Sequence, residues 1–376
     1  MNINKIPKNI RVLVPFWLKR ILVRFFVKII LIGSPGKFDK PRISFAGILP
    51  PEGAFIRGGK VKLTHLRKRF GEYKKNFNIL YLVSSTLPGF SDIWVDEAKR
   101  KGVKVVWNQN GIGCPAWSPI WKKINNSMKP LAKADYVVYQ SNFSQTESED
   151  MVAKADCPTT VITNCCDTTI FKPAEPSLSS TPLRLLIMGT HMTPEKILVP
   201  LKALRILLNK GLDVNIRIYG PAEWPNAEVD INNTIKELDL ENRVLRRGKY
   251  LQNEAPDLYR EGHIYIHLKH MDSSPTAILE AIASGLPVIG SKSGGVAEWI
   301  SPEAGITLEV PISREKLFYP SPEKVAEAVE IISKDLAKYS IGARRHAVKF
   351  FDDKDWIKAH EVVFNKILKN EKKSTN

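Results

Sequence analysis

The stretch from Asp272 to Glu280 contains residue types that can bind a ligand with several hydroxyl groups. Two carboxylates lie eight residues apart, and the residues between them are typical of a loop followed by the start of a helix. Amides in the first turn of a helix are free donors with a positive dipole, and carboxylates accept hydrogen bonds from vicinal hydroxyls. The stretch therefore predicts a site for a sugar or a nucleotide, although the same pattern also occurs at purely structural helix starts. The residues of helix-start type between the two acids are Ser273, Ser274, Pro275 and Thr276.

Short apolar runs alternate with helical stretches along most of the chain, and this rhythm predicts parallel α/β sheets. Clear strand candidates are Ile79–Ser84, Val103–Trp107, Leu183–Met188 and Asn215–Tyr219. The length of 376 residues exceeds one ordinary core and favours two domains. Because ligands of such sheets bind at the carboxyl ends of the strands, two facing domains would enclose one cleft.

A Pro- and Ser-rich stretch at 174–181 is the only obvious linker in the middle of the chain. We expect a first Rossmann-like domain over 41–173 and a second one over 182–345. Both are predicted to be doubly wound. A C-terminal helix with a Lys-rich tail, over 346–376, is expected to cross back to the first domain.

The net charge of +17 belongs almost entirely to one end of the chain. Residues 1–80 hold 18 Lys and Arg but only three acids. Residues 1–40 include an apolar stretch in which Arg20, Arg24 and Lys28 lie at helical spacing. With Trp17 and several Phe residues nearby, this segment predicts a basic amphipathic helix that associates with an anionic membrane surface through residues 1–33. A helix packed on the protein's own surface, or on a partner, is the alternative.

Composition excludes several other classes. An apolar fraction of 43% and a charged fraction of 25% rule out general disorder. The four cysteines form neither a disulfide framework nor a zinc pattern, which favours a reducing cytosol. Aromatic residues near the N-terminus are interleaved with aliphatic ones, which suits lipid better than stacked bases, so no nucleic-acid partner is expected. We interpret His65, His346 and His360 as surface residues.

The segment after Asp272 resembles the donor-site signature of the GT-B glycosyltransferases, in particular the retaining group 1 or family 4 class. That signature has two acids separated by seven residues, then small residues, Pro-Val, and Gly-Gly followed by Glu. The first acid is Asp here instead of Glu, which shortens its reach by one methylene. Together with other matches, the resemblance covers about residues 43–350. The matching positions are Asp272, Glu280, Ala281, Ala283, Gly285, Pro287, Val288, Gly294, Gly295 and Glu298.

Further segments resemble the same family in order, including the interdomain segment Asn164–Pro173 and the loop Gly189–Lys196. Lys196 lies where the family has a diphosphate-binding lysine. Thr190 lies where the family has arginine, so a bidentate clamp on phosphate is missing. His191 or a basic residue of the first domain is the expected replacement.

The resemblance implies a role for each site residue. Lys196, with backbone amides of the Gly58-Gly59 loop, would stabilise the departing diphosphate, and Glu280 would hold the ribose. Asp272 and the amides around Ser274–Ala277 would hold the donor sugar, and Asn110, where many relatives have His, would position that sugar from the first domain. The implied donor-binding residues are Gly58, Gly59, Gly189, Thr190, Lys196, Arg243, Val244, Ser274, Pro275, Thr276, Ala277 and Glu280.

The implied reaction is a retaining, metal-independent glycosyl transfer from a nucleotide-diphosphate sugar to an acceptor hydroxyl, with no further cofactor. The acceptor would be a glycan or a lipid-linked glycan in the synthesis of a bacterial lipopolysaccharide, capsule or exopolysaccharide. The enzyme would then lie on the inner face of the cytoplasmic membrane. Two alternatives stay open: a sugar-nucleotide epimerase or phosphorylase of the same fold, and a non-catalytic protein that binds sugar nucleotides or anionic surfaces.

Overall fold

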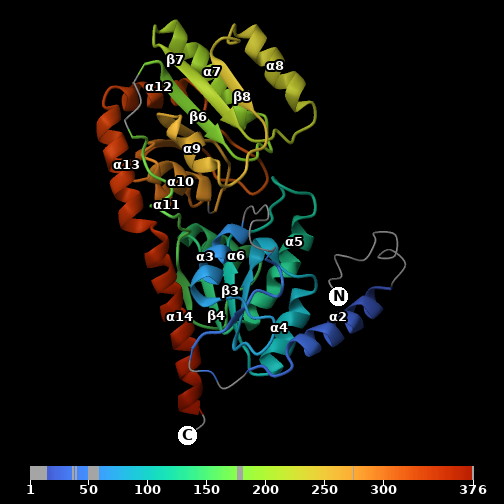
Figure 1. The fold of residues 1–376 in the computed structure, drawn as a ribbon. Coiled ribbons are helices and arrows are strands. Elements are labelled where there is room, and N and C mark those ends of the chain that lie inside the picture. Colours follow the sequence, from blue (N-terminus) through green and yellow to red (C-terminus); the bar gives the residue numbers. More distant parts are fainter. Residues whose placement is uncertain are drawn as a thin grey trace.

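The chain folds into two parallel sheets, one above the other, each covered by helices (Figure 1). The computed structural model describes residues 15–35, 38, 40–49, 59–175, 181–273 and 275–374. The lower sheet is built from residues between 43 and 161, and the upper sheet from residues between 183 and 309. The expected two-domain α/β architecture is therefore confirmed.

The first sheet has five parallel strands in the order β1-β2-β3-β4-β5. Among the described residues its strands follow one another in sequence order, without the reversal of a doubly wound sheet. Apolar side chains point to both faces because helices cover both, and this explains the continuous apolar runs of the strands. The strands are β1 (Ile43–Ser44), β2 (Ile79–Val83), β3 (Lys104–Gln109), β4 (Tyr136–Tyr139) and β5 (Thr159–Val161). The helical elements are α2 (Phe16–Ile30), α3 (Lys60–Phe70), η2 (Ser84–Thr86), α4 (Ser91–Arg100), α5 (Trp121–Met128), η3 (Lys129–Lys133) and α6 (Asn142–Met151).

The second sheet has six parallel strands in the order β11-β10-β9-β6-β7-β8. This order reverses at β6, so β6 and its neighbour β9 form the switch point at which doubly wound sheets bind ligands. The strands are β6 (Leu183–Met188), β7 (Val214–Tyr219), β8 (Val244–Arg247), β9 (Ile264–His267), β10 (Val288–Lys292) and β11 (Gly305–Glu309). The helices are α7 (Glu195–Asn209), α8 (Ala227–Glu237), α9 (Ala255–Arg260), α10 (Thr276–Ala283), α11 (Val296–Trp299), α12 (Pro322–Ser333), α13 (Leu336–Phe350) and α14 (Asp353–Ser374).

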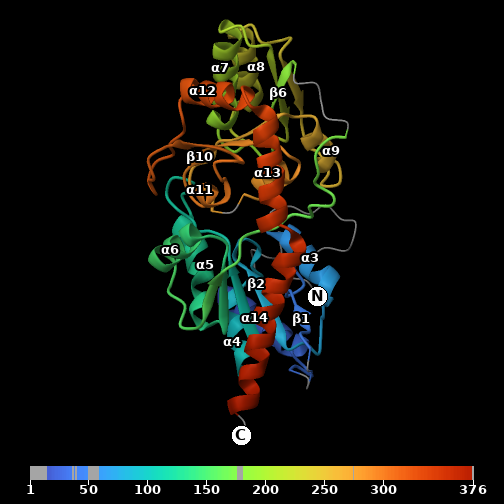
Figure 2. The same cartoon turned by 90° about the vertical axis from the view of Figure 1, so that its left-hand side faces the viewer.

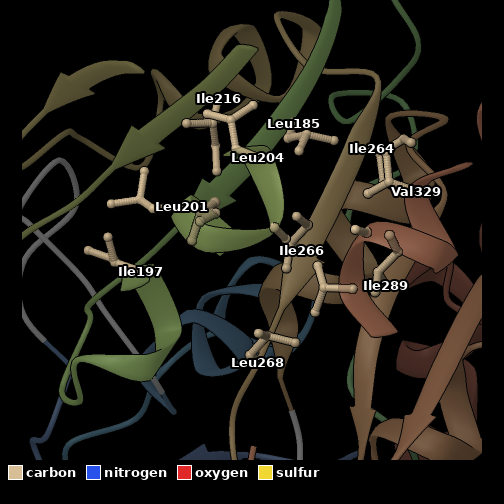
Figure 3. Packing of buried hydrophobic residues seen from close by; sticks show 14 of the residues in the cluster. Leu185, Ile197, Leu201, Leu204, Ile216, Ile264, Ile266, Leu268, Ile289 and Val329 are labelled. Atoms are coloured by element: carbon tan, nitrogen blue, oxygen red, sulfur yellow. The ribbon is translucent and has the colours of Figure 1, made fainter. Parts of the chain in front are cut away.

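Helix α7 shows how the sequence pattern builds this domain. Ile197, Leu201 and Leu204 recur at three- and four-residue spacing and form one apolar stripe of the helix. The stripe packs on the sheet beside Leu185 and Ile216 (Figure 3). Each fully buried aliphatic side chain contributes roughly 1.5–3 kcal/mol to stability. The first residues of α7 are thereby fixed at the carboxyl end of β6, where the site residues lie.

The C-terminal helix α14 leaves the second domain and runs down along the first, as expected (Figure 2). Phe364 is fully buried against the sheet, and the ring of His360 forms a 2.9 Å hydrogen bond through Nε2 with the hydroxyl of Tyr81. The interpretation of His360 as a surface residue is therefore wrong, because its helix covers the first sheet. His65 and His346 are half-buried.

Helix α2 is packed on the first domain through one face only. Val23 and Val27 are buried against the domain, and Arg20 and Arg24 form ion pairs with acids of α4. These two arginines of the basic stripe therefore face the protein. For this face of the helix, the alternative prediction of a helix packed on its own domain is observed. Among the described residues, no helix is both long enough and apolar enough to span a membrane.

All four cysteines lie in the described part of the chain, and none forms a disulfide. Cys114, Cys165 and Cys166 are buried, and Cys157 is half-buried. Burial raises the pKa of each thiol. These cysteines behave as core residues.

Candidate functional site

The candidate site lies at the carboxyl ends of β6, β7 and β9, on the side of the second domain that faces the first. Gly189 and Gly220 begin the loops after β6 and β7, and both have positive φ angles, of 101° and 110°. A Cβ on Gly220 would lie 2.0 Å from the carbonyl oxygen of Gly189. The two loops can approach each other this closely only because position 220 has no side chain.

Lys196 is placed by the start of α7. Its Nζ donates a 2.8 Å hydrogen bond to the carbonyl oxygen of Thr190, and its side chain is buried. Burial, together with the nearby charge of Lys269, lowers the pKa of Lys196 to about 8. The ammonium group is therefore still mostly charged at neutral pH, and an anionic ligand would stabilise it.

Asp272 is buried between two basic side chains. Its Oδ2 lies 3.1 Å from Nε2 of His267 and 3.1 Å from Nζ of Lys269. Burial alone would raise the pKa of Asp272, but Lys269 and the hydrogen bond with His267 outweigh it and hold the pKa well below its ordinary value. Burial lowers the pKa of His267, so the ring is neutral and its Nε2–H can donate to the carboxylate. Asp272 is thus a permanently ionised acceptor.

Glu280 lies on the buried side of α10. One of its oxygens accepts a 3.0 Å hydrogen bond from Nε2 of Gln252, and the other accepts one of 3.0 Å from the hydroxyl of Tyr259. Burial raises the pKa of Glu280 to about 7, because no cation is paired with it in the described part of the chain. The two acids of the signature therefore have opposite electrostatic environments.

The segment between the two acids forms the expected loop and helix start. Pro275 is the N-cap residue of α10, one position before the expected first turn, and Thr276 and Ala277 begin the helix. The carbonyl oxygen of Ala277 accepts a 3.1 Å hydrogen bond from Tyr259. The prediction for Ser274 falls outside the described residues. The amides of this turn are near Asp272 in sequence and lie at the same end of the sheet.

The first domain contributes the start of α3 and the loops after β2 and β3. A Cβ on Gly59 would lie 2.2 Å from Oγ of Ser85 and 3.2 Å from Nδ2 of Asn110, so Gly59 packs directly on these loops. The prediction for Gly58 falls outside the described residues.

Asn110 was expected to face the donor sugar, but its side chain is engaged within its own domain. Its Oδ1 accepts hydrogen bonds from Oγ of Ser84 at 2.9 Å and from the amide of Ser85 at 3.3 Å, and its Nδ2 donates to Oγ of Ser85 at 2.9 Å. In this structure Asn110 holds two loops together, because short hydroxyl side chains lie within its reach.

Hydrogen bonds between the domains bring these two groups of residues together. Oγ of Ser141, at the N-cap of α6, donates to the carbonyl oxygen of Ser273 at 3.1 Å. Nε1 of Trp117 donates to the carbonyl oxygen of His270 at 3.1 Å. Both acceptors belong to the loop that carries Asp272, so the first domain covers this loop directly.

Arg243 and Val244, expected beside the nucleobase, do not join the site. They lie at the amino-terminal end of β8, and the guanidinium of Arg243 pairs with Asp213 at 2.5 Å. A strand of four residues separates them from the carboxyl end by about 13 Å. Tyr250, which follows β8, is close to the site instead, since burial and the nearby Glu280 raise its pKa.

Four residues of the site were missed in the sequence: Gln252, Tyr259, His267 and Lys269. Gln252 and Tyr259 precede the acids in the chain, and no local pattern marks them. His267 could have been found, because it ends the strand that leads into Asp272. In the described ranges no three His, Cys, Asp or Glu side chains form a possible metal site. Two surface cavities of about 600 and 720 Å³ lie elsewhere and contain none of the site residues.

Two α/β domains whose strand ends face each other, with a C-terminal helix crossing back, define the GT-B fold. Solved structures of that fold are similar to this chain. A glycosyltransferase from Rickettsia africae is 21% identical, with 85% of each chain covered and a TM-score of 0.59. Anabaena Alr3699/HepE in complex with UDP-glucose is 18% identical, with 84% of this chain and 81% of that chain covered and a TM-score of 0.59.

Sequence comparison matches the second domain to a known family. Residues 182–335 match the family described as glycosyl transferases group 1. The amylovoran biosynthesis glycosyltransferase AmsK of Erwinia amylovora is 29% identical over 136 residues, which are 32% of this chain and 33% of AmsK. The match thus spans about a third of that relative. The expectation of a GT-B fold is confirmed, and the match over the second domain supports the expectation of a group 1 glycosyltransferase.

Proposed function

We propose that this protein transfers a sugar from a nucleotide-diphosphate sugar to an acceptor hydroxyl with retention of configuration. The observation that carries the proposal is the set of three buried ionisable side chains that the second domain holds at its strand ends: the carboxylates of Asp272, before α10, and Glu280, within it, and the ammonium of Lys196 at the start of α7. The carboxylates suit sugar and ribose hydroxyls, and the ammonium suits a diphosphate. HepE, a structural relative, was solved with UDP-glucose, which supports a donor of this class.

The chemistry needs little more than charge stabilisation. The bond between the anomeric carbon and the diphosphate oxygen breaks, and its electron pair stays with the diphosphate. The acceptor oxygen bonds to the anomeric carbon on the same face and loses its proton to the departing diphosphate. Lys196 would stabilise the growing negative charge, and such a preorganised group is worth about 10²–10³ in rate. No step requires a metal ion or a cofactor.

The first test measures donor binding and turnover in variants. Lys196→Ala and Glu280→Ala should each lower turnover at least ~10²-fold, the effect of losing one electrostatic contact to the transition state. Lys210→Ala is the matched control, because Lys210 is ion-paired with Glu330 at the far end of α7. Near-normal turnover in both site variants would contradict the assignment. Release of free sugar without an acceptor would indicate an epimerase or hydrolase.

The acceptor side of the proposal rests on chemistry and similarity together. AmsK, a relative, is named for amylovoran biosynthesis, which supports a bacterial cell-surface glycan. We propose that this acceptor is a lipid-linked glycan at the inner face of the cytoplasmic membrane. An assay with lipid-linked acceptors and a panel of nucleotide sugars tests this.

The outer face of α2 supports association with that membrane. Trp17, Ile21 and Phe25 are 63%, 56% and 64% exposed and lie on the side of the helix opposite the buried Val23 and Val27. An aromatic and aliphatic face of this kind, near exposed basic side chains, is typical of helices that lie in the membrane interface.

Vesicle flotation tests the membrane contact. The variant Trp17→Ser/Phe25→Ser should lose most binding to vesicles that contain phosphatidylglycerol. Ile341→Ser is the control, since Ile341 is also exposed but lies on α13 of the other domain. Unchanged flotation of the double variant would contradict membrane binding through α2.

A further inference from the structure

A diphosphate carries at least two negative charges, so the single ammonium of Lys196 leaves the candidate site short of positive charge. His191 does not supply it. Its ring is fully buried and forms a hydrogen bond between Nε2 and the carbonyl oxygen of Tyr219. Burial, with Lys196 nearby, lowers the pKa of His191 to about 3, so the ring is neutral. The expectation that His191 adds a cation at this loop is therefore wrong.

The pairing of the strands shows where a second cation lies. Strands β6 and β9 are parallel neighbours, and their register pairs Leu185 with Ile264 and Leu186 with Tyr265. The two strands end at equivalent positions, Met188 and His267. Thr190 and Lys269 each lie two residues beyond the end of their strand, so both follow the adjacent carboxyl ends of β6 and β9. Lys269 also lies near Lys196, because its charge acts on that ammonium, and Lys196 contacts the carbonyl oxygen of Thr190.

The surroundings of Lys269 suit contact with a ligand. Its side chain is 36% exposed, whereas that of its partner Asp272 is only 11% exposed. Its Nζ lies 5.9 Å from the ring centre of Trp117, a residue of the first domain, so the ammonium lies between the two domains. One carboxylate neutralises one of the two ammonium groups, and the loops retain a net positive charge for an anion.

We propose that Lys269 binds the diphosphate of the nucleotide sugar beside Lys196 and provides the positive charge that the side chain at position 190 lacks. This inference rests on the proposed function and extends it to a second phosphate-binding residue. Lys269 neither gives nor takes a proton in the reaction. It stabilises the electron pair that the diphosphate oxygen keeps when the bond to the sugar breaks.

A purely structural role of Lys269 would be to hold Asp272 in place, and the choice of ligand separates the two roles. Asp272 is assigned to the sugar, so a substitution of Lys269 that acts only by displacing Asp272 changes the affinity for UDP-glucose but not the affinity for UDP. Loss of a direct contact between Lys269 and the diphosphate weakens the affinity for both ligands. The expected loss is about 10- to 100-fold in Kd for UDP.

Calorimetric titration of the full chain tests the inference. The wild type is titrated with UDP, GDP and ADP, and the nucleotide that binds most tightly is used for Lys269→Gln, Lys269→Arg and the control Lys210→Gln. We expect Lys269→Gln to lose most of the nucleotide affinity, Lys269→Arg to keep most of it, and the control to bind like the wild type. Thr190→Arg added to Lys269→Gln should increase the nucleotide affinity at least tenfold, because it places a guanidinium on the loop that Lys196 contacts. Circular dichroism confirms that each variant is folded.

The outcomes separate this inference from the proposed function. If the wild type binds none of the three nucleotides, the proposed function fails and the inference fails with it. If the wild type binds and Lys196→Ala weakens binding, but Lys269→Gln leaves the diphosphate affinity unchanged, only the inference is overturned. Failure of Thr190→Arg to restore affinity to a folded Lys269→Gln chain also overturns it, since the charge would then not act at this position.

Discussion

The carboxylate of Glu298, in the second domain, accepts a 2.9 Å hydrogen bond from the backbone amide of Phe143, in the first. It also accepts a 2.9 Å hydrogen bond from the backbone amide of Asn142. These two amides belong to the first turn of α6, so one domain supplies the charge that caps a helix of the other. The contact can form only when the domains are close together, and it therefore stabilises the closed arrangement.

Replacing Glu298 should favour opening of the cleft. Glu298→Gln keeps the shape but removes the charge at the helix N-terminus, which costs about 1 kcal/mol. We expect a larger radius of gyration in small-angle X-ray scattering and a higher KM for the donor. Glu303→Gln is the control, because Glu303 forms an exposed pair with Arg345 within the same domain. Equal scattering of Glu298→Gln and wild type would contradict a role in closure.

An ion pair also joins the domains, again at α6. Nε and Nη2 of Arg314 donate to the carboxylate of Glu147 at 2.8 and 3.0 Å, and Nη2 also donates to Asp150 at 2.9 Å. Because the side chain of Glu147 is only 10% exposed, this pair should be stronger than a surface salt bridge. A double-mutant cycle with Arg314→Met and Glu147→Gln, measured by urea unfolding, should give a coupling energy of roughly 1–3 kcal/mol. A coupling near zero would mean that solvent screens the pair.

The sequence predicted the parts of this protein that depend on local pattern. The buried stripe of α7 follows from spacing alone, and the loop and helix start between Asp272 and Glu280 follow from the residue types there. Contacts set by the packing of distant segments were not found. The hydrogen bonds of Asn110 with Ser84 and Ser85 and the burial of His360 under α14 depend on tertiary structure, which no local pattern encodes.

The error at Arg243 has a different cause. A motif fixes the order of residues in the chain, but not which end of a short strand they occupy. Strand β8 begins at Val244, one residue after Arg243. Arg243 and Val244 therefore lie at the amino-terminal end of the strand, away from the carboxyl end where the candidate site lies. Lys269 was missed because its significance depends on β6 and β9 being neighbours, which requires knowledge of the strand order.

The pKa of Glu280, raised to about 7 by burial, predicts a pH dependence. The native state binds more protons than the unfolded chain between the ordinary glutamate pKa of about 4.3 and about 7. The contribution of Glu280 to stability is therefore complete below about pH 4.3 and is lost as the pH rises through about 7. Urea unfolding between pH 5 and 8 should show this decline, on the order of 3 kcal/mol in total.

Glu280→Gln is the variant that isolates this effect. An amide cannot titrate, so stability of the variant should change less with pH over the same range than that of the wild type. Donor binding has the opposite dependence, since only the ionised carboxylate accepts from two ribose hydroxyls, and affinity should increase from pH 6 to pH 8 in the wild type. Parallel stability curves for the two proteins would mean that Glu280 titrates at its ordinary pKa.

The close approach of the loops after β6 and β7 predicts that Gly220 tolerates no side chain. Gly220→Ala would place a methyl group 2.0 Å from the carbonyl oxygen of Gly189, at a φ of 110° that L-residues rarely adopt. The loops must separate, which should cost about 2 kcal/mol or more and weaken donor binding, because Gly189 leads into Thr190 and Lys196. Gly248→Ala is the matched control, since Gly248 has open space around its Cβ position and no positive φ. Unfolding midpoints and nucleotide titrations of the two variants measure the difference, and equal values would show that the loops separate without cost.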